Sequence, residues 1–352
     1  MPLEPLSTQI KSRLGTAARE LRTVNPTPFM ARMLDETFRL PAGDPRYARN
    51  ALTPGAAPIE PTFGTAHPRA LSFSLEPLGP EASGVDRRDT ATREMRRMVS
   101  ESFGGEALRW FDKSSEPYRG MVGGGNLRYG AFFGSSFDHD GLQSANVTFE
   151  SGGDRICDLP PNLMAMVGPV MAMLPGLQPV FTTLIAGRQH GNQRVTFLLT
   201  STLRVSELLP IMTDMGIGNQ LPGILQIIGV ALGGRFDLPP GSTLIALGRG
   251  PQGPELELHI MLDAIPDVPP DFLALLTLNL TERPRELAAL ERFMSAFTPE
   301  TDIWPGRFSI LGVRASAGGP PKVSLFLRPV EFEIPPAAMI APAASIAAPA
   351  LV

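Results

Sequence analysis

The sequence predicts an α/β protein whose strands close into one antiparallel β-barrel of about ten strands, ringed by helices. Two observations predict this. Hairpins of alternating apolar and polar residues recur at intervals of roughly fifty to seventy residues, with helical segments between them, as in an internal repeat of helix, strand and strand. Hydrophobic residues make up 43% of the chain and charged residues 19%, which is enough for a substantial core. So many antiparallel strands usually close or curl to remove their edges.

Two helices are predicted at the start of the chain. Residues 6–24 place Ile10, Leu14 and Leu21 on one face, and residues 27–39 follow the break at Asn25-Pro26. We expect both helices to pack on the barrel as an N-terminal unit over 1–40.

The barrel domain is expected over residues 41–332. Its first part, 41–68, is rich in Pro, Gly and Ala and is predicted to be mostly loop. The residues after it, 333–352, form an Ala/Pro-rich tail that we expect to be disordered.

Each predicted hairpin has two alternating runs around a turn that contains glycine, and the clearest turn is Asp140-Gly141. The paired runs are 126–138 with 142–150, 179–187 with 192–201, 242–248 with 255–262, and 307–316 with 322–329, and a less regular hairpin pairs 59–63 with 69–78. Helices are expected near 91–112, 161–174, 204–233 and 269–297.

The composition excludes several classes of partner. The net charge is −4 and the chain has only three lysines, so a basic stripe for nucleic acid is not expected. The most apolar segment, 208–234, is interrupted by Asp214, Asn219 and Pro222, which indicates buried helix rather than a membrane span. We expect a monomer or homodimer that binds a small molecule.

Metal and cofactor sites are not predicted. The single cysteine, Cys157, cannot form an internal disulfide or a Cys-rich metal site, and it fits a reducing cytoplasm. The four histidines include no i, i+4 pair, so a zinc site is not expected. Phosphate-loop and dinucleotide fingerprints are not evident, and we expect no cofactor.

Glu60 is the leading candidate for acid/base chemistry. It lies between Pro58 and Pro61, just before an alternating strand. If it were buried beside an aromatic N–H or O–H, its pKa would rise and it could act as a general acid or base. The alternative is an ordinary loop carboxylate.

Two segments carry a resemblance to a known family: TPGAAPIE at 53–60 and LSFSLEPLG at 71–79. They resemble segments of the ABBA-fold aromatic prenyltransferases, of the dimethylallyl tryptophan synthase type. The resemblance implies a barrel of αββα repeats that holds an indole-like aromatic molecule, with Glu60 beside the indole nitrogen. It also implies a diverged member, because the family's diphosphate cage of Arg, Lys and Tyr is mostly replaced.

The resemblance assigns lumen positions to residues on several strands. These positions are Ser72, Asn146, Thr148, Arg194, Thr196, Leu198, Glu257, His259 and Phe326. In this register Arg194 is the basic residue that remains and Glu257 replaces a lysine. A shift by two residues would bring Arg249, Arg314 or Arg328 inward.

Arg194, Glu257 and His259 each have two interpretations. Arg194 needs an anionic partner, which is either Glu257 or the carboxylate or phosphate of a ligand. Glu257 and His259 share a strand face. If that face is the lumen, they form an acid/base pair opposite Glu60; if it is the outside, helices or solvent cover them.

These observations predict a cytoplasmic enzyme of secondary metabolism. It would bind an apolar aromatic or isoprenoid-bearing molecule and catalyse an acid/base-assisted cyclisation, cycloaddition or rearrangement, with Glu60, Glu257 and His259 as catalytic residues. One alternative is a true aromatic prenyltransferase that uses an allylic diphosphate. A second is a non-catalytic carrier of a hydrophobic metabolite.

Overall fold

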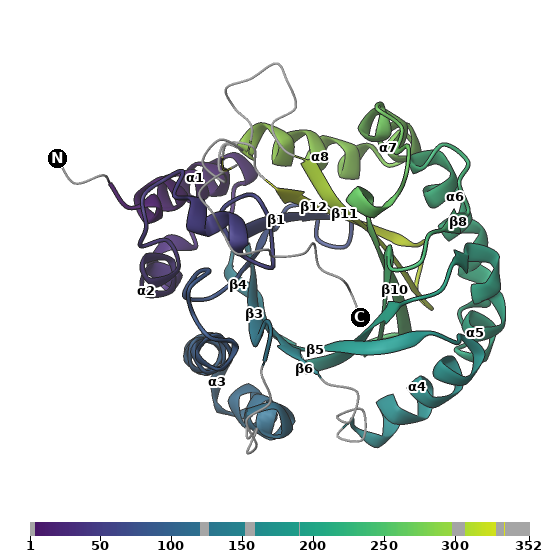
Figure 1. Cartoon of the computed structure of the whole chain (residues 1–352), viewed down its shortest axis with the longest axis horizontal. Coiled ribbons are helices and arrows are strands. Elements are labelled where there is room, and N and C mark those ends of the chain that lie inside the picture. The colour runs from purple at the N-terminus through teal and green to yellow at the C-terminus, as the bar shows by residue number, and fades with distance from the viewer. Residues whose placement is uncertain are drawn as a thin grey trace.

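The strands of the protein form a closed barrel inside a ring of helices (Figure 1). The computed structural model describes residues 4–119, 127–151, 159–189, 191–297, 307–328 and 334. Cys157 and nearly all of the predicted tail lie outside these residues. The predicted fold class, an antiparallel barrel of ten strands ringed by helices, is confirmed.

The barrel follows the strand order β1-β12-β11-β10-β9-β6-β5-β4-β3-β2, and β2 closes on β1. Its strands are β1 (Ile59–Gly64), β2 (Leu71–Leu75), β3 (Ala131–Asp138), β4 (Gly141–Glu150), β5 (Leu177–Gly187), β6 (Gly191–Leu199), β9 (Thr243–Gly250), β10 (Gly253–Met261), β11 (Arg307–Ser316) and β12 (Lys322–Arg328). All five predicted hairpins are present. Two short strands, β7 (Leu203–Arg204) and β8 (Asp237–Leu238), pair separately.

The helices lie on the outside of the barrel, in chain order around its circumference (Figure 1). They are α1 (Leu6–Leu21), α2 (Thr27–Thr37), α3 (Gly84–Arg119), α4 (Pro161–Met173), α5 (Leu209–Asp214), α6 (Leu221–Ala231), α7 (Phe272–Leu280) and α8 (Pro284–Phe297). The predicted helix 204–233 is divided in two where Gly216 takes a positive φ. The predicted helix 269–297 is divided where Pro284 starts α8, because proline cannot continue the preceding helix.

The main hydrophobic core lies between the barrel and the helices. Outward-facing aromatic side chains of the strands meet aromatic side chains of the helices: Phe63 of β1 lies 5.9 Å from Phe293 of α8, and Phe149 of β4 lies 5.7 Å from Tyr118 of α3, ring centre to ring centre. These four rings are buried. The alternation along each strand therefore directs its large apolar residues outward, toward the helices.

The inward-facing residues make up the lumen, and they are more polar and less buried. On β2 the outward residues Leu71, Phe73 and Leu75 are buried while the inward Ser72 and Ser74 keep partial exposure, and the same alternation runs through most of β4. A small barrel whose interior is its core would show the opposite pattern. The lumen is thus lined by side chains that solvent can reach. Among the described helices, none has the length and apolar character needed to cross a membrane.

Candidate active site in the barrel lumen

Glu60 lies on the inward face of β1 and is 4% exposed. Its Oε1 atom accepts a hydrogen bond of 2.9 Å from the Ser309 hydroxyl of β11. Burial raises the pKa of Glu60 to about 7, and the Ser309 hydrogen bond opposes this rise only in part. Near neutral pH both protonation states are populated, which is the property of a group that can both take and return a proton.

Ser309 faces inward because β11 has a β-bulge. The register of β11 with β12 shifts between Phe308, which pairs with Leu327, and Ile310, which pairs with Phe326, so Ser309 is the extra residue. Phe308 points outward, with its ring 6.4 Å from that of Phe272 in α7. Bulges commonly redirect a side chain next to a functional site.

A second buried carboxylate, Glu76, organises the loop that leads to Glu60. It is 1% exposed, accepts backbone hydrogen bonds from Ala51 (2.6 Å) and Leu52 (3.2 Å), and lies 2.9 Å from Arg87 of α3. Burial raises the pKa of Glu76, against the opposing effect of Arg87. Glu76 therefore fixes the path of the chain.

Arg194 lies in the lumen on β6 and is held by two carboxylates of β10. Its Nη1 donates to Glu257 Oε2 and its Nη2 to Glu255 Oε2, each at 2.9 Å. Arg314 of β11 reaches the same Glu255 oxygen at 3.9 Å. Of the two interpretations of Arg194, the internal ion pair is the one present in the structure.

Arg314 corrects the charge inventory expected for the lumen. The register taken from the resemblance leaves Arg194 as the basic residue of the lumen. However, Arg314 of β11 lies directly beside Glu257 of the neighbouring strand β10 and also faces inward. Lys322 of β12 pairs with Arg314 in the strand register, but its Nζ lies 3.9 Å from Glu286 of the outer helix α8. The apolar alternation of Leu311, Val313 and Ala315 is the sequence signal that puts Arg314 on the opposite, inward face of β11.

Glu257 and His259 both face the lumen. His259 Nε2 lies 3.4 Å from Glu257 Oε1, and its ring lies 5.6 Å from the ring of Phe326 on β12. Burial would raise the pKa of Glu257, but His259, Arg194 and Arg314 outweigh it and hold the pKa below its usual range. Glu257 is therefore an anion when Glu60 is half protonated.

The sequence analysis expected Glu257 and His259, if they faced the lumen, to lie opposite Glu60. In the structure they lie on a nearby part of the barrel wall instead. The strand order places only β12 and β11 between β1, with Glu60, and β10, with Glu257 and His259. Phe326 of β12 lies between them on this wall: it pairs with Thr62 next to Glu60 and contacts His259. Glu60, Phe326 and His259 thus lie on the same part of the barrel wall.

Glycines on neighbouring strands make room for several of these side chains. A Cβ atom on Gly248 would lie 2.6 Å from Arg194 Cγ, and one on Gly312 would lie 3.5 Å from both Glu257 Oε1 and the Phe326 ring. A Cβ atom on Gly134 would lie 2.5 Å from Asn146 Nδ2. Arg194, Asn146 and Phe326 can therefore lie flat against the barrel wall.

Ser72, Asn146 and Thr148 face the lumen on the other side of β1. The Ser72 hydroxyl lies 2.8 Å from that of Ser136, and the Thr148 hydroxyl lies 2.9 Å from that of Thr183. These two contacts join uncharged hydroxyl groups. Thr196 and Leu198 face inward on β6 and are buried.

An aromatic cluster missed by the sequence analysis lies between β3 and β5. Tyr129, Phe132 and Phe181 have ring centres 5.8–6.1 Å apart, and all three rings are partly exposed. Burial raises the pKa of Tyr129. The period-two alternation already placed Phe132 on a strand, three residues after Tyr129, but Phe181 becomes their neighbour only when β3, β4 and β5 pair.

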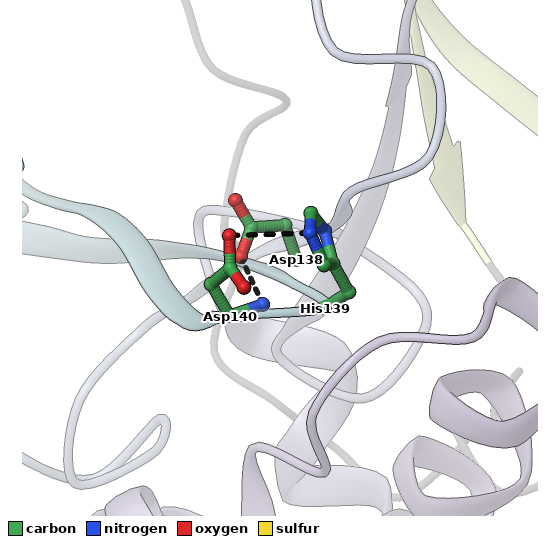
Figure 2. Close-up of side chains that lie close together, drawn as sticks. All are labelled: Asp138, His139 and Asp140. Carbon is green, nitrogen blue, oxygen red and sulfur yellow. Dashed lines mark hydrogen bonds and ion pairs between the residues drawn. The ribbon is translucent and has the colours of Figure 1, made fainter.

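Asp138, His139 and Asp140 gather at the β3–β4 turn (Figure 2). Both oxygens of Asp138 accept hydrogen bonds of 2.7 Å from Arg188, while His139 and Asp140 are exposed. A cation here would compete with a bound guanidinium. This grouping lies at the end of the barrel and takes no part in the site around Glu60.

Comparison with solved structures supports the fold. No family model and no curated protein matches the sequence. The 6-dimethylallyltryptophan synthase from Micromonospora olivasterospora aligns with a TM-score of 0.72 at 15% identity, over 94% of this chain and 99% of that one. The 5-dimethylallyltryptophan synthase from Streptomyces coelicolor aligns with a TM-score of 0.69 at 16% identity over the same shares, and the prenyltransferase PriB with 0.68 at 16% identity over 94% and 98%. The chain thus has the ABBA barrel fold, as the resemblance implied.

Proposed function

We propose that the lumen catalyses an acid/base-assisted ring closure of an apolar aromatic, indole-like or isoprenoid-bearing molecule, with Glu60 as the proton-transfer group. The observation that carries this proposal is a carboxyl group of pKa about 7, buried in the wall of a partly solvent-accessible lumen. Its acid and base forms are both available near neutral pH.

In the proposed step, an N–H or O–H of the substrate loses its proton to Glu60 while the N or O atom closes onto an electron-poor carbon of the same molecule. The proton then returns to the atom that receives the electron pair, so the product is an isomer of the substrate. Glu257 and His259 lie next along the wall and would supply a second acid/base pair. Phe326, between them and Glu60, offers its ring to an aromatic substrate.

The charge pairing favours ring closure over prenyl transfer. A diphosphate needs cations that are free to compensate it. Here Arg194 is bound by Glu255 and Glu257, and Arg314 and Lys322 each lie 3.9 Å from a carboxylate. An incoming diphosphate would have to displace these internal anions or lie beside them at a cost in free energy.

Aromatic prenyl transfer remains the second candidate, and a specific observation favours it. Arg194 and Arg314 face the lumen on one wall and Lys322 pairs with Arg314 on the next strand, so basic residues gather there as a diphosphate site requires. PriB has been solved with product diphosphate and, in a second structure, with L-tryptophan and dimethylallyl thiolodiphosphate.

Product mass distinguishes the candidates. The purified protein would be incubated with tryptophan and dimethylallyl diphosphate, and separately with a panel of prenylated indoles. A new product of unchanged mass, lost in Glu60→Gln, is the expected result. A product heavier by one prenyl group would instead establish prenyl transfer. Binding of prenylated indoles without turnover, unchanged in Glu60→Gln, would indicate the carrier.

A further inference from the structure

The Ser309 hydroxyl lies within hydrogen-bonding distance of two different acceptors. It is 2.9 Å from Glu60 Oε1 and 3.3 Å from the backbone oxygen of Phe326. A hydroxyl carries a single proton, so it donates to one of these oxygens at a time, while its own oxygen can accept a hydrogen bond.

We propose that Ser309 is the positioning residue of Glu60, and that its hydroxyl reverses its hydrogen bond to serve both protonation states of the carboxyl group. With Glu60 ionised, Ser309 donates to Oε1. With Glu60 protonated on Oε1, the carboxyl group donates to Ser309 Oγ and Ser309 donates to the Phe326 oxygen. The assignment deepens the proposed function, since it explains how a buried carboxyl group can change its protonation state there.

The physical reason is the cost of a buried polar group without a partner. Glu60 is 4% exposed, so solvent cannot supply the missing hydrogen bond when its proton arrives or leaves. A fixed donor, such as a backbone N–H, would favour the ionised form alone. A hydroxyl that can both donate and accept keeps either form satisfied, and the bulge at Ser309 is what directs that hydroxyl inward.

The charged side chains on the elements around Glu60 make their contacts with other groups. On β12, Arg328 donates to the Pro54 carbonyl oxygen at 3.1 Å and lies 3.9 Å from Asp263. After β2, Glu76 is paired with Arg87. On β10, His259 contacts Phe326 and Glu257. Ser309 is thus the side chain whose hydrogen bond acts on the Glu60 carboxyl group.

The test is a pH titration of Glu60 in the protein without substrate. The protonated carboxyl band in infrared difference spectra measures the fraction of Glu60 that is protonated at each pH. The band is assigned by its loss in Glu60→Gln. In Ser309→Ala the midpoint should rise by about one pH unit, a tenfold change in the ionisation equilibrium, because the anion loses a stronger hydrogen bond than the neutral carboxyl group does. Ser309→Thr keeps a hydroxyl and should restore the wild-type midpoint.

Two further variants keep the test decisive. Ser309→Cys replaces the hydroxyl with a weak donor and should shift the midpoint in the same direction if the alanine variant does not fold. Ser324→Ala removes a lumen hydroxyl of β12 and should leave the midpoint unchanged. A Ser309→Ala midpoint equal to that of the wild type would overturn the assignment. Since this readout needs no turnover, the assignment can hold even if no ring closure is found.

Discussion

Arg194 reaches Glu257 across a strand that carries a glycine at the crossing point. Arg194 of β6, Gly248 of β9 and Glu255 of β10 pair at one level of the barrel, and Arg194 Nη1 extends to Glu257 Oε2 at 2.9 Å. A Cβ atom on Gly248 would lie 2.6 Å from Arg194 Cγ. The ion pairs that neutralise Arg194 therefore depend on a residue without charge or side chain.

Replacing Gly248 should disturb this network. Gly248→Ala forces Arg194 away from the wall and should destabilise the protein by about 1–3 kcal/mol, as overpacking of buried sites does. Urea denaturation measures the change. Gly168→Ala in α4 is the matched control, because its new methyl group meets nothing within 4 Å and a helical alanine is favoured over glycine. Equal stability of Gly248→Ala and wild type would show that Arg194 does not need the gap.

Removing the two carboxylates should create an anion site. In the double variant Glu255→Gln/Glu257→Gln, Arg194 and Arg314 lose their internal partners. Inorganic pyrophosphate should then bind at least about tenfold more tightly than to the wild type, measured by calorimetry at fixed salt. Glu81→Gln/Glu101→Gln changes the net charge equally at exposed positions and should not alter binding. Tight pyrophosphate binding by the wild type would instead favour prenyl transfer.

Glu60 should make the protein less stable as pH rises. Its folded-state pKa of about 7 lies above the ordinary value of 4.5 for a glutamate, so between these values the folded state binds more protons than the unfolded state. Its contribution is fully present below the unfolded pKa and is lost as pH rises through the folded pKa. From pH 5 to pH 8 the free energy of unfolding should fall by about 2.5 kcal/mol more in the wild type than in Glu60→Gln. Parallel denaturation curves for the two proteins would contradict the buried, protonated carboxyl.

The buried ion pair between Glu76 and Arg87 should contribute strongly to the stability of the fold. Arg87→Ala leaves Glu76 buried without its cation and should cost about 3–5 kcal/mol, measured by chemical denaturation. Arg32→Ala breaks the exposed Arg32–Glu36 pair on α2 and should cause no measurable change. Similar losses in both variants would mean that Glu76 is held mainly by the amides of Ala51 and Leu52.

The fold was predictable because its signals are local. Alternation and turn residues located the strand pairs, and Asp140-Gly141 marks the β3–β4 turn as expected. The element boundaries were less certain, since α3 begins at Gly84, earlier than its apolar pattern suggested. Glu60 could be singled out because prolines isolate it in the sequence, and the alternation put Glu257 and His259 on one face.

The chemistry of the lumen depends on contacts between strands far apart in the chain. Ser309 and Glu60 are 249 residues apart, and a bulge that breaks the alternation of β11 brings them together. The closure of the barrel also places Glu257 and His259 on the same part of the wall as Glu60, and it brings Glu255 and Glu257 to Arg194. Residue types and periodicity specify which face of a strand is apolar, because each strand buries that face against a helix. The strand order, register and bulge of the closed barrel decide which polar side chains meet inside it. They therefore decide which groups in the lumen can transfer a proton and which charges are paired.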